Sequence, residues 1–210
     1  MAHAFRRRED GSLACRLDGE EKAIIAQVAQ ETADLIRADL GIEADAGVLR
    51  RAADSEDPLR RLEAEFAGRD AREPSDSAVK RLFPAASEDT ELAAEYRRLG
   101  QQHLAEGKLA DLRRVMAVLD AAGPDHSEVV LDEEDALVVL RALNDVRIVL
   151  ADRLDLQRDG DFDTVRMLQQ IGERVEGAAV EDDEHVSADI VIAVYELLSW
   201  LQESLLRALD

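Results

Sequence analysis

Apolar residues recur three or four positions apart along most of this 210-residue chain, and that spacing constrains the fold more than any other feature. It predicts helices over about 19–40, 58–66, 87–122, 133–154, 164–176 and 187–209. The last stretch is apolar on most sides, so we expect it to be the central helix of the core. No strand–helix–strand alternation is visible, which argues against the α/β folds that bind nucleotides through a glycine-rich turn.

The chain therefore reads as mainly α, a helical bundle with an N-terminal β-hairpin over 3–17. We expect one domain over 1–210, with internal loops at 68–77 and 155–163. In the long helix over 87–122, the stripe expected to face the core is Leu92, Tyr96, Leu99, His103, Leu109, Leu112, Met116 and Leu119. Gly100 and Gly107 lie inside this helix, where they would mark either a bend or a close helix crossing.

The register of the hairpin follows from its apolar residues. A two-residue turn at Asp10-Gly11 would place Phe5 on the opposite face from the apolar residues of the second strand. A three-residue loop, with Gly11 in the left-handed region, pairs Phe5 with Cys15. This second register gathers one apolar face of Phe5, Leu13, Cys15 and Leu17, so we expect it, with Cys15 as a small buried side chain.

Composition excludes several function classes. Acidic residues number 47 against 26 basic ones, and the formal charge of −21 argues against ordinary nucleic-acid binding. The run from Arg6 to Arg8 is the only basic cluster, and we expect it to contact acidic neighbours in the same chain. One cysteine rules out an intramolecular disulfide and a cysteine-based zinc site. With no apolar window long enough to span a bilayer, we expect a cytoplasmic protein without cofactor, nucleic-acid partner or membrane partner.

One acidic string resembles a calcium loop. It offers four candidate oxygen ligands, all aspartates: Asp155, Asp159, Asp161 and Asp163. The twelfth position should be a bidentate glutamate, but it is Arg166, a cation that would repel the ion. We therefore favour an acidic turn between helices and keep these aspartates only as weak metal candidates.

Polar residues also interrupt the apolar stripes of the predicted core helices. They are Glu95, Arg98, Asn144, Asp145, Arg147 and Gln202. Because a buried charge is costly unless it is paired, we expect these residues to satisfy one another as a network across helices. The alternative is a groove in which Glu95 and Asp145 act as an acid–base pair, although neighbouring arginines would keep both carboxylates ionised. We expect His103, within the long stripe, to be packed and hydrogen-bonded.

Five strings together resemble a known family. They are Phe5-Arg-Arg-Arg8 with Asp10-Gly11, Arg81-Leu-Phe-Pro84, Ala94-Glu-Tyr-Arg-Arg-Leu99, Ala142-Leu-Asn-Asp-Val-Arg147 and the run from Val194 to Leu205. Their order is similar to that of an actinobacterial family, domain of unknown function twenty-seventeen. The sequence departs from the family pattern at Ala151 and Asp152, where a glycine and a small hydroxyl residue are usual.

The resemblance implies no established reaction, substrate or catalytic residue. Relatives are commonly encoded beside the adaptor that feeds substrates to the Clp protease, which implies a regulatory or adaptor role. Our leading expectation is a non-enzymatic protein that binds a protein partner, with a homodimer left open. The alternative is an enzyme or small-molecule binder that uses the Glu/Arg/Asn/Asp cluster.

Overall fold

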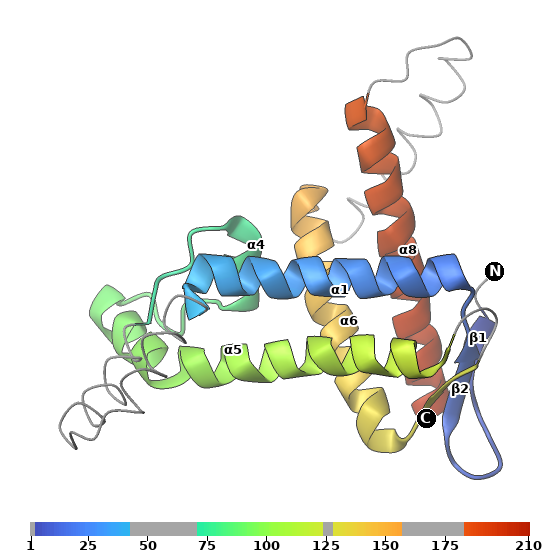
Figure 1. Cartoon of the computed structure of the whole chain (residues 1–210). Helices are drawn as coiled ribbons and strands as arrows, with labels where there is room; N and C mark the ends of the chain where they lie inside the picture. Colours follow the sequence, from blue (N-terminus) through green and yellow to red (C-terminus); the bar gives the residue numbers. More distant parts are fainter. Residues whose placement is uncertain (1–2, 43–70, 124–127, 157–182) are drawn as a thin grey trace, which may run out of the picture.

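The computed structural model describes residues 3–42, 71–123, 128–156 and 183–210. These residues form a mainly helical bundle with a small sheet, as predicted (Figure 1). The helices are α1 (Gly19–Leu40), α4 (Ser77–Leu82), α5 (Thr90–Ala121), α6 (Glu133–Arg153) and α8 (Asp183–Leu209), and the strands are β1 (His3–Arg7), β2 (Leu13–Arg16) and β3 (Glu128–Leu131).

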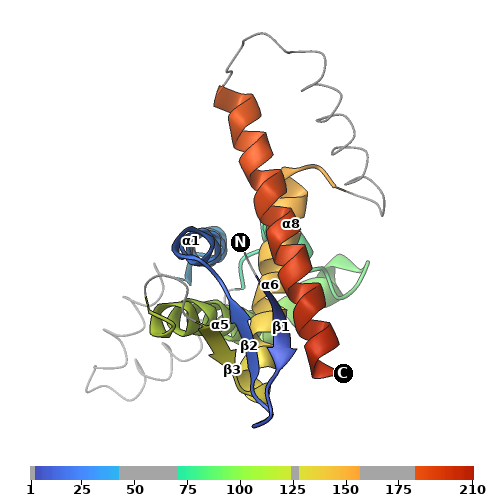
Figure 2. The same ribbon diagram turned by 90° about the vertical axis from the view of Figure 1, so that its right-hand side faces the viewer.

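The helices form two crossing layers. Helices α1 and α5 lie side by side, and α6 and α8 run behind them in a steeply different direction (Figure 1). The sheet closes one end of the bundle, next to the last turns of α8, and α4 lies toward the other end (Figures 1 and 2). Because α6 contacts α1, α4, α5, α8 and β3, it is the helix that joins the parts of the core.

Helix ends lie where local capping chemistry puts them. Asp18 and Glu21 form a complete capping box at the start of α1, and Gly41 ends that helix in the left-handed conformation, with φ 70°. Helix α5 begins slightly later than expected, because the Asp89 carboxylate accepts its first backbone N–H groups. The predicted helices over 58–66 and 164–176 lie outside the described residues.

The hairpin has the predicted three-residue loop. Arg7 pairs with Leu13 and Arg6 with Ala14, and Gly11 has a φ of 86°. A bulge further along β1 shifts His3 onto Arg16. Cys15 is buried with the other apolar residues of this face, and burial raises the pKa of its thiol to about 12.

A third strand was not predicted. The segment Glu128–Leu131 pairs antiparallel with β2 and turns the hairpin into a three-stranded sheet in the order β1-β2-β3. Its four residues alternate between exposed and buried, a pattern too short to predict a strand from the sequence.

Helix α8 buries one face rather than most of its surface. Leu198, Leu201 and Leu205 are among the most buried side chains of the core, whereas Trp200 is 39 % exposed. The first turns of α8 extend away from the bundle (Figure 2). The central position that we expected for this helix therefore belongs to α6, because α6 is covered from more sides.

Candidate functional site

The structure divides the predicted polar network into separate arrangements. Among the described residues, Glu95 and Arg98 pair with each other along the exposed side of α5, with Arg98 N–H groups 2.7 and 3.1 Å from the Glu95 carboxylate oxygens. The Arg98 hydrogen bond lowers the pKa of Glu95. Asn144 is also exposed. The expectation of one network joining these residues to Asp145 and Arg147 is therefore wrong, because Glu95 and Arg98 pair with each other at the surface whereas Asp145 is buried.

Asp145 has a partner that the sequence analysis did not consider. Its buried carboxylate accepts a hydrogen bond from Lys108 Nζ on α5 at 2.7 Å. The same ammonium lies 6.0 Å from the centre of the Phe83 ring. Burial raises the pKa of Asp145, and the Lys108 contact only partly opposes that rise.

Lys108 and Asp145 belong to a ladder of three ion pairs between the crossing helices α5 and α6. The next two rungs join Asp111 to Arg141 at 2.7 Å and Arg114 to Asp135 at 2.6 Å. Charge alternates along each helix, so a shift of one helix turn would bring like charges together. The ladder therefore fixes the register of these helices.

Arg147 closes the interface between α6 and α8. Its guanidinium donates to Ser199 Oγ at 2.9 Å and to the side-chain carbonyl of Gln202, and it lies 5.2 Å from the Tyr195 ring centre. The structure thus brings together two of the predicted residues, Arg147 and Gln202. Their hydrogen-bonding groups face each other, which is the arrangement of a structural contact.

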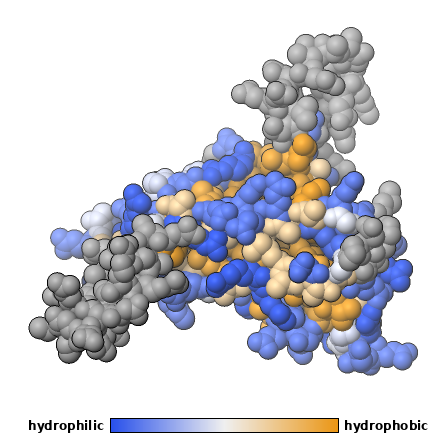
Figure 3. Space-filling model, in the orientation of Figure 1, coloured by the Kyte–Doolittle hydropathy of each residue, from blue (hydrophilic) through white to orange (hydrophobic). Residues whose placement is uncertain are grey.

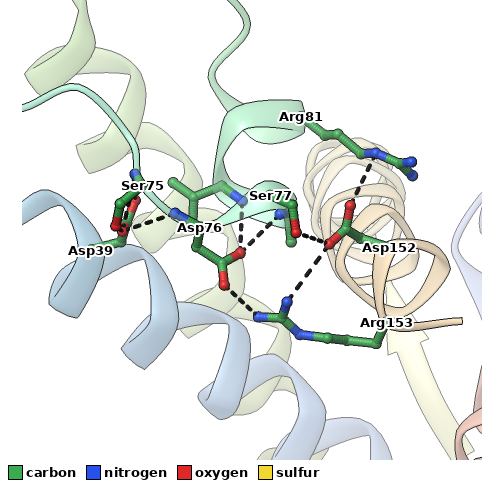
Figure 4. Close-up of polar contacts among 9 residues, drawn as sticks. Asp39, Ser75, Asp76, Ser77, Arg81, Asp152 and Arg153 are labelled. Atoms are coloured by element: carbon green, nitrogen blue, oxygen red, sulfur yellow. Dashed lines mark hydrogen bonds and ion pairs between the residues drawn. The ribbon is translucent and has the colours of Figure 1, made fainter. Parts of the chain in front are cut away.

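A further polar cluster joins α1, α4 and α6 (Figure 4). Asp76 caps α4 and also accepts from Arg153 at 2.8 Å, while Asp152 accepts from the Ser77 hydroxyl and lies 3.1 Å from Arg81 Nε. On the other side, the Asp39 carboxylate of α1 accepts the Ser75 N–H at 3.0 Å. Each acidic group in this cluster has a donor, so the cluster fastens the short helix α4 to its neighbours.

Sequence reasoning missed this cluster and the role of the lysines. Two of the three lysines are inside the fold: Lys108 pairs with Asp145, and Lys22 donates to the carbonyl of Gly123. Almost all basic residues of this chain are arginines, so the rarity of lysine was the sequence feature that could have drawn attention to these two positions. The pairs that Asp76 forms with Arg153 and Asp152 with Arg81 gave no comparable signal, because these residues are more than 70 positions apart in the sequence.

The described residues offer no enclosed chemical site. No buried side-chain nitrogen or oxygen in the described ranges lacks a hydrogen-bond partner, and no three metal-ligating side chains gather there. Of the weak metal candidates, Asp155 follows α6 with a positive φ of 54°, and Asp159, Asp161 and Asp163 lie outside the described residues. Among the described helices, none has an apolar stretch that could cross a bilayer.

The first half of α5 exposes large apolar side chains. Leu92, Tyr96 and Leu99 are 47, 52 and 65 % exposed, and His103 is exposed beside them. The prediction that this part of the stripe faces the core, with a packed His103, is wrong. The buried positions in this half are Ala93, Gln101 and Ala105, because a different face of the helix meets the bundle. We call Leu92, Tyr96, Leu99 and His103 the α5 stripe.

The α5 stripe has the spacing of a helix-pairing seam. Its members are separated by four, three and four residues, the spacing that keeps side chains on one face of a helix. Gly100 has nothing within 4 Å of the place where a Cβ would stand, so it marks no close helix crossing within the described residues.

Comparison with known proteins identifies the family. A family model described as a domain of unknown function (DUF2017) matches residues 2–209. The chain belongs to this family. No curated protein and no solved structure gives a significant match. Since the family has no assigned activity, function has to be argued from the surfaces of the molecule.

Proposed function

We propose that this protein is a non-enzymatic interaction protein, with a regulatory or adaptor role, that binds an amphipathic helix of a partner protein on the α5 stripe. The observation that carries the proposal is the exposure of Leu92, Tyr96 and Leu99 at helix-pairing spacing. Large apolar side chains gathered on an exposed face are typical of interaction sites.

The surroundings of the stripe favour an apolar helix as the partner. Beside it, Glu95 pairs with Arg98 within α5, and the Glu106 carboxylate accepts a hydrogen bond from the Gln102 amide. The Glu95 and Arg98 charges therefore already have partners when another helix docks. Helix-in-groove recognition uses apolar anchors three, four and seven residues apart, which the stripe supplies.

An adaptor role suits a small contact of this kind. Three large apolar side chains make a patch at the lower end of known interfaces, where transient contacts are found. A stable dimer needs roughly 800 Å² from each partner, more than three partly exposed side chains provide. We therefore place a partner protein before a second copy of this chain, and we place its action in the cytoplasm.

The residues named for the enzymatic alternative do not lie together. It required Glu95 and Asp145 to share a groove between two core helices. Glu95 is exposed and paired with Arg98, whereas Asp145 is buried and paired with Lys108.

The test needs one residue of the stripe and a matched control. A photoreactive amino acid at Leu99 would identify partners by crosslinking in cells, and the purified Clp adaptor and Clp chaperone subunits are the first candidates to test. Each candidate is then titrated with the native protein and with Leu99→Asp. Leu137→Asp is the control, because Leu137 is 49 % exposed on another helix.

The expected result is a loss of affinity of roughly tenfold or more for Leu99→Asp and no loss for Leu137→Asp. Equal affinity of the two variants would overturn the proposal. So would a crosslink only to a second copy of the chain, together with concentration-dependent dimerisation that Leu99→Asp abolishes.

A further inference from the structure

The outer face of the three-stranded sheet carries a groove whose charge opposes that of the whole chain. The groove has a volume of about 430 Å³, and its charged lining is Arg6, Arg7, Arg8, Arg16 and Glu128, with His3 at one end. The pairing register places Ala14 between Arg6 and Val130, so a small side chain forms the floor. Helices α5 and α6 lie behind the sheet, and its outer face is turned to solvent (Figure 2).

The arginines of this groove have different partners. Arg7 reaches out of it and donates to the carbonyls of Ala208 and Leu209 at the end of α8, at 3.1 and 2.8 Å. Arg8 and Arg16 both pair with Glu128. Arg6 is exposed and has no ion-pair or hydrogen-bond partner within the described residues. Even without Arg7, three arginines therefore face one carboxylate in a chain whose formal charge is −21.

The contacts of Glu128 indicate what the groove can hold. Its carboxylate is shared between Arg8, which directly follows β1, and Arg16 on β2. Guanidinium groups bind carboxylates through charge-assisted hydrogen bonds, and Arg6 offers the same donors on the same face. Arg6 lies on β1 and Arg8 directly follows it, and two residues of extended backbone span about 7 Å, which matches alternate side chains of an extended peptide.

We propose that the groove binds an acidic segment of a partner protein in extended form, with Arg6 and Arg16 as the residues that bind its carboxylates. The inference rests on the sheet and not on the α5 stripe, so either proposal can fail without the other. A local positive patch on an acidic protein favours a short acidic segment and orients it.

Other occupants fit the groove less well. A long nucleic acid would extend beyond it onto acidic surface and be repelled, and no aromatic side chain lines the groove for base stacking. A single small anion would stay largely hydrated in an open groove, whereas a peptide can engage several arginines at once.

Strand addition at the β1 edge of the sheet is also disfavoured. The Phe5 N–H of β1 donates to Ser204 Oγ at 3.3 Å, and Arg7 joins the same strand to the end of α8. The outer edge of β1 is therefore already covered by α8. Recognition in the groove would depend on side chains that stand on the face of the sheet.

The experiment uses the full chain and a fluorescein-labelled peptide with aspartates at alternate positions. Anisotropy titrations at low and physiological salt compare the native protein with Arg6→Glu and Arg16→Glu. The control is Arg98→Glu, which makes the same change of charge on an exposed arginine of α5. Circular dichroism and thermal midpoints confirm that each variant is folded.

We expect the native protein to bind the peptide more weakly as salt rises, and to bind the matched asparagine peptide hardly at all. Arg6→Glu and Arg16→Glu should each weaken binding by roughly tenfold or more, while Arg98→Glu leaves it unchanged.

Three results would overturn the proposal. One is an equal loss in all three variants, which would show a general charge effect. Another is full competition by inorganic phosphate or by single-stranded DNA at the concentration of the peptide. The third is absence of peptide binding together with self-association that Arg6→Glu abolishes, which would make a second copy the occupant.

Discussion

Helix α5 has two halves with similar apolar spacing and different surroundings. In the second half, Leu109, Leu112 and Val115 are buried against α1, α6 and the sheet, and ion pairs to α6 fix the register. In the first half, Leu92, Tyr96 and Leu99 are exposed. Apolar periodicity thus predicts that a helix has an apolar face, but it does not show whether the protein's own core or a partner covers that face.

The ion pairs of the two halves of α5 also differ in their burial. Lys108 and Asp145 join two helices inside the fold, whereas Glu95 and Arg98 lie three residues apart on one exposed helix. A buried pair is costly to break because it leaves an unpaired charge, and an exposed pair contributes little. The second half of α5 therefore anchors the bundle, and we expect substitutions on the exposed face of the first half to leave the fold intact.

The largest expected difference between the halves is in truncation of leucine. Leu112→Ala should lower the free energy of unfolding by about 3–4 kcal/mol, because its side chain is fully buried and a cavity remains. Leu99→Ala should change it by less than about 0.5 kcal/mol. Urea denaturation of both variants measures the difference, and similar losses would show that the first half is also part of the core.

Removal of the buried carboxylate should have the next largest effect. Asp145→Ala leaves Lys108 without its partner and should cost about 2–3 kcal/mol, less than for a fully enclosed pair because water can reach the lysine end. Urea denaturation measures this loss. The double variant Lys108→Met/Asp145→Leu should recover much of it, and failure to recover any would mean that the pair is needed for packing.

The same carboxylate should make a pH-dependent contribution. Burial raises the pKa of Asp145 in the folded protein above its ordinary value of 3.8, which holds in the unfolded chain. At a pH between the unfolded-state pKa and the folded-state pKa, the folded protein therefore binds the proton more tightly than the unfolded chain. The stability that the group contributes therefore falls as pH rises above about 3.8. We expect the unfolding free energy of the native protein, minus that of Asp145→Asn, to decrease with pH and then level off. A difference that increases with pH would contradict the prediction.

The smallest expected effect is a gain. Gly100→Ala should stabilise the protein by about 0.5–1 kcal/mol, because alanine favours the helix and nothing within 4 Å opposes a Cβ. Thermal unfolding measures the gain. If the variant is more stable and binds the partner less well, the glycine serves the approach of that partner. A loss of stability would show that the first half of α5 packs more closely than its exposure indicates.

Local interactions made much of the fold predictable. The capping box at Asp18 and Glu21, the glycine stop at Gly41 and the three-residue loop of the hairpin all depend on residues near one another in the chain. The same applies to the cap at Asp132, which sets where α6 begins. These features could be predicted because their partners are a few residues away.

The candidate site was predicted less well, for a physical reason. Which face of α5 meets the bundle depends on where α1 and α6 lie, and the pairing of Asp145 with Lys108 joins residues 37 positions apart. The four-residue strand β3 exists because β2 offers it hydrogen-bonding partners more than a hundred residues earlier in the chain. The sequence by itself thus determined the four long helices, several of their ends and the turn of the hairpin, through short-range hydrogen bonds, whereas the short helix α4 was not predicted. Only the tertiary structure decided which apolar faces are buried and which charges are paired, because those choices depend on contacts between distant segments.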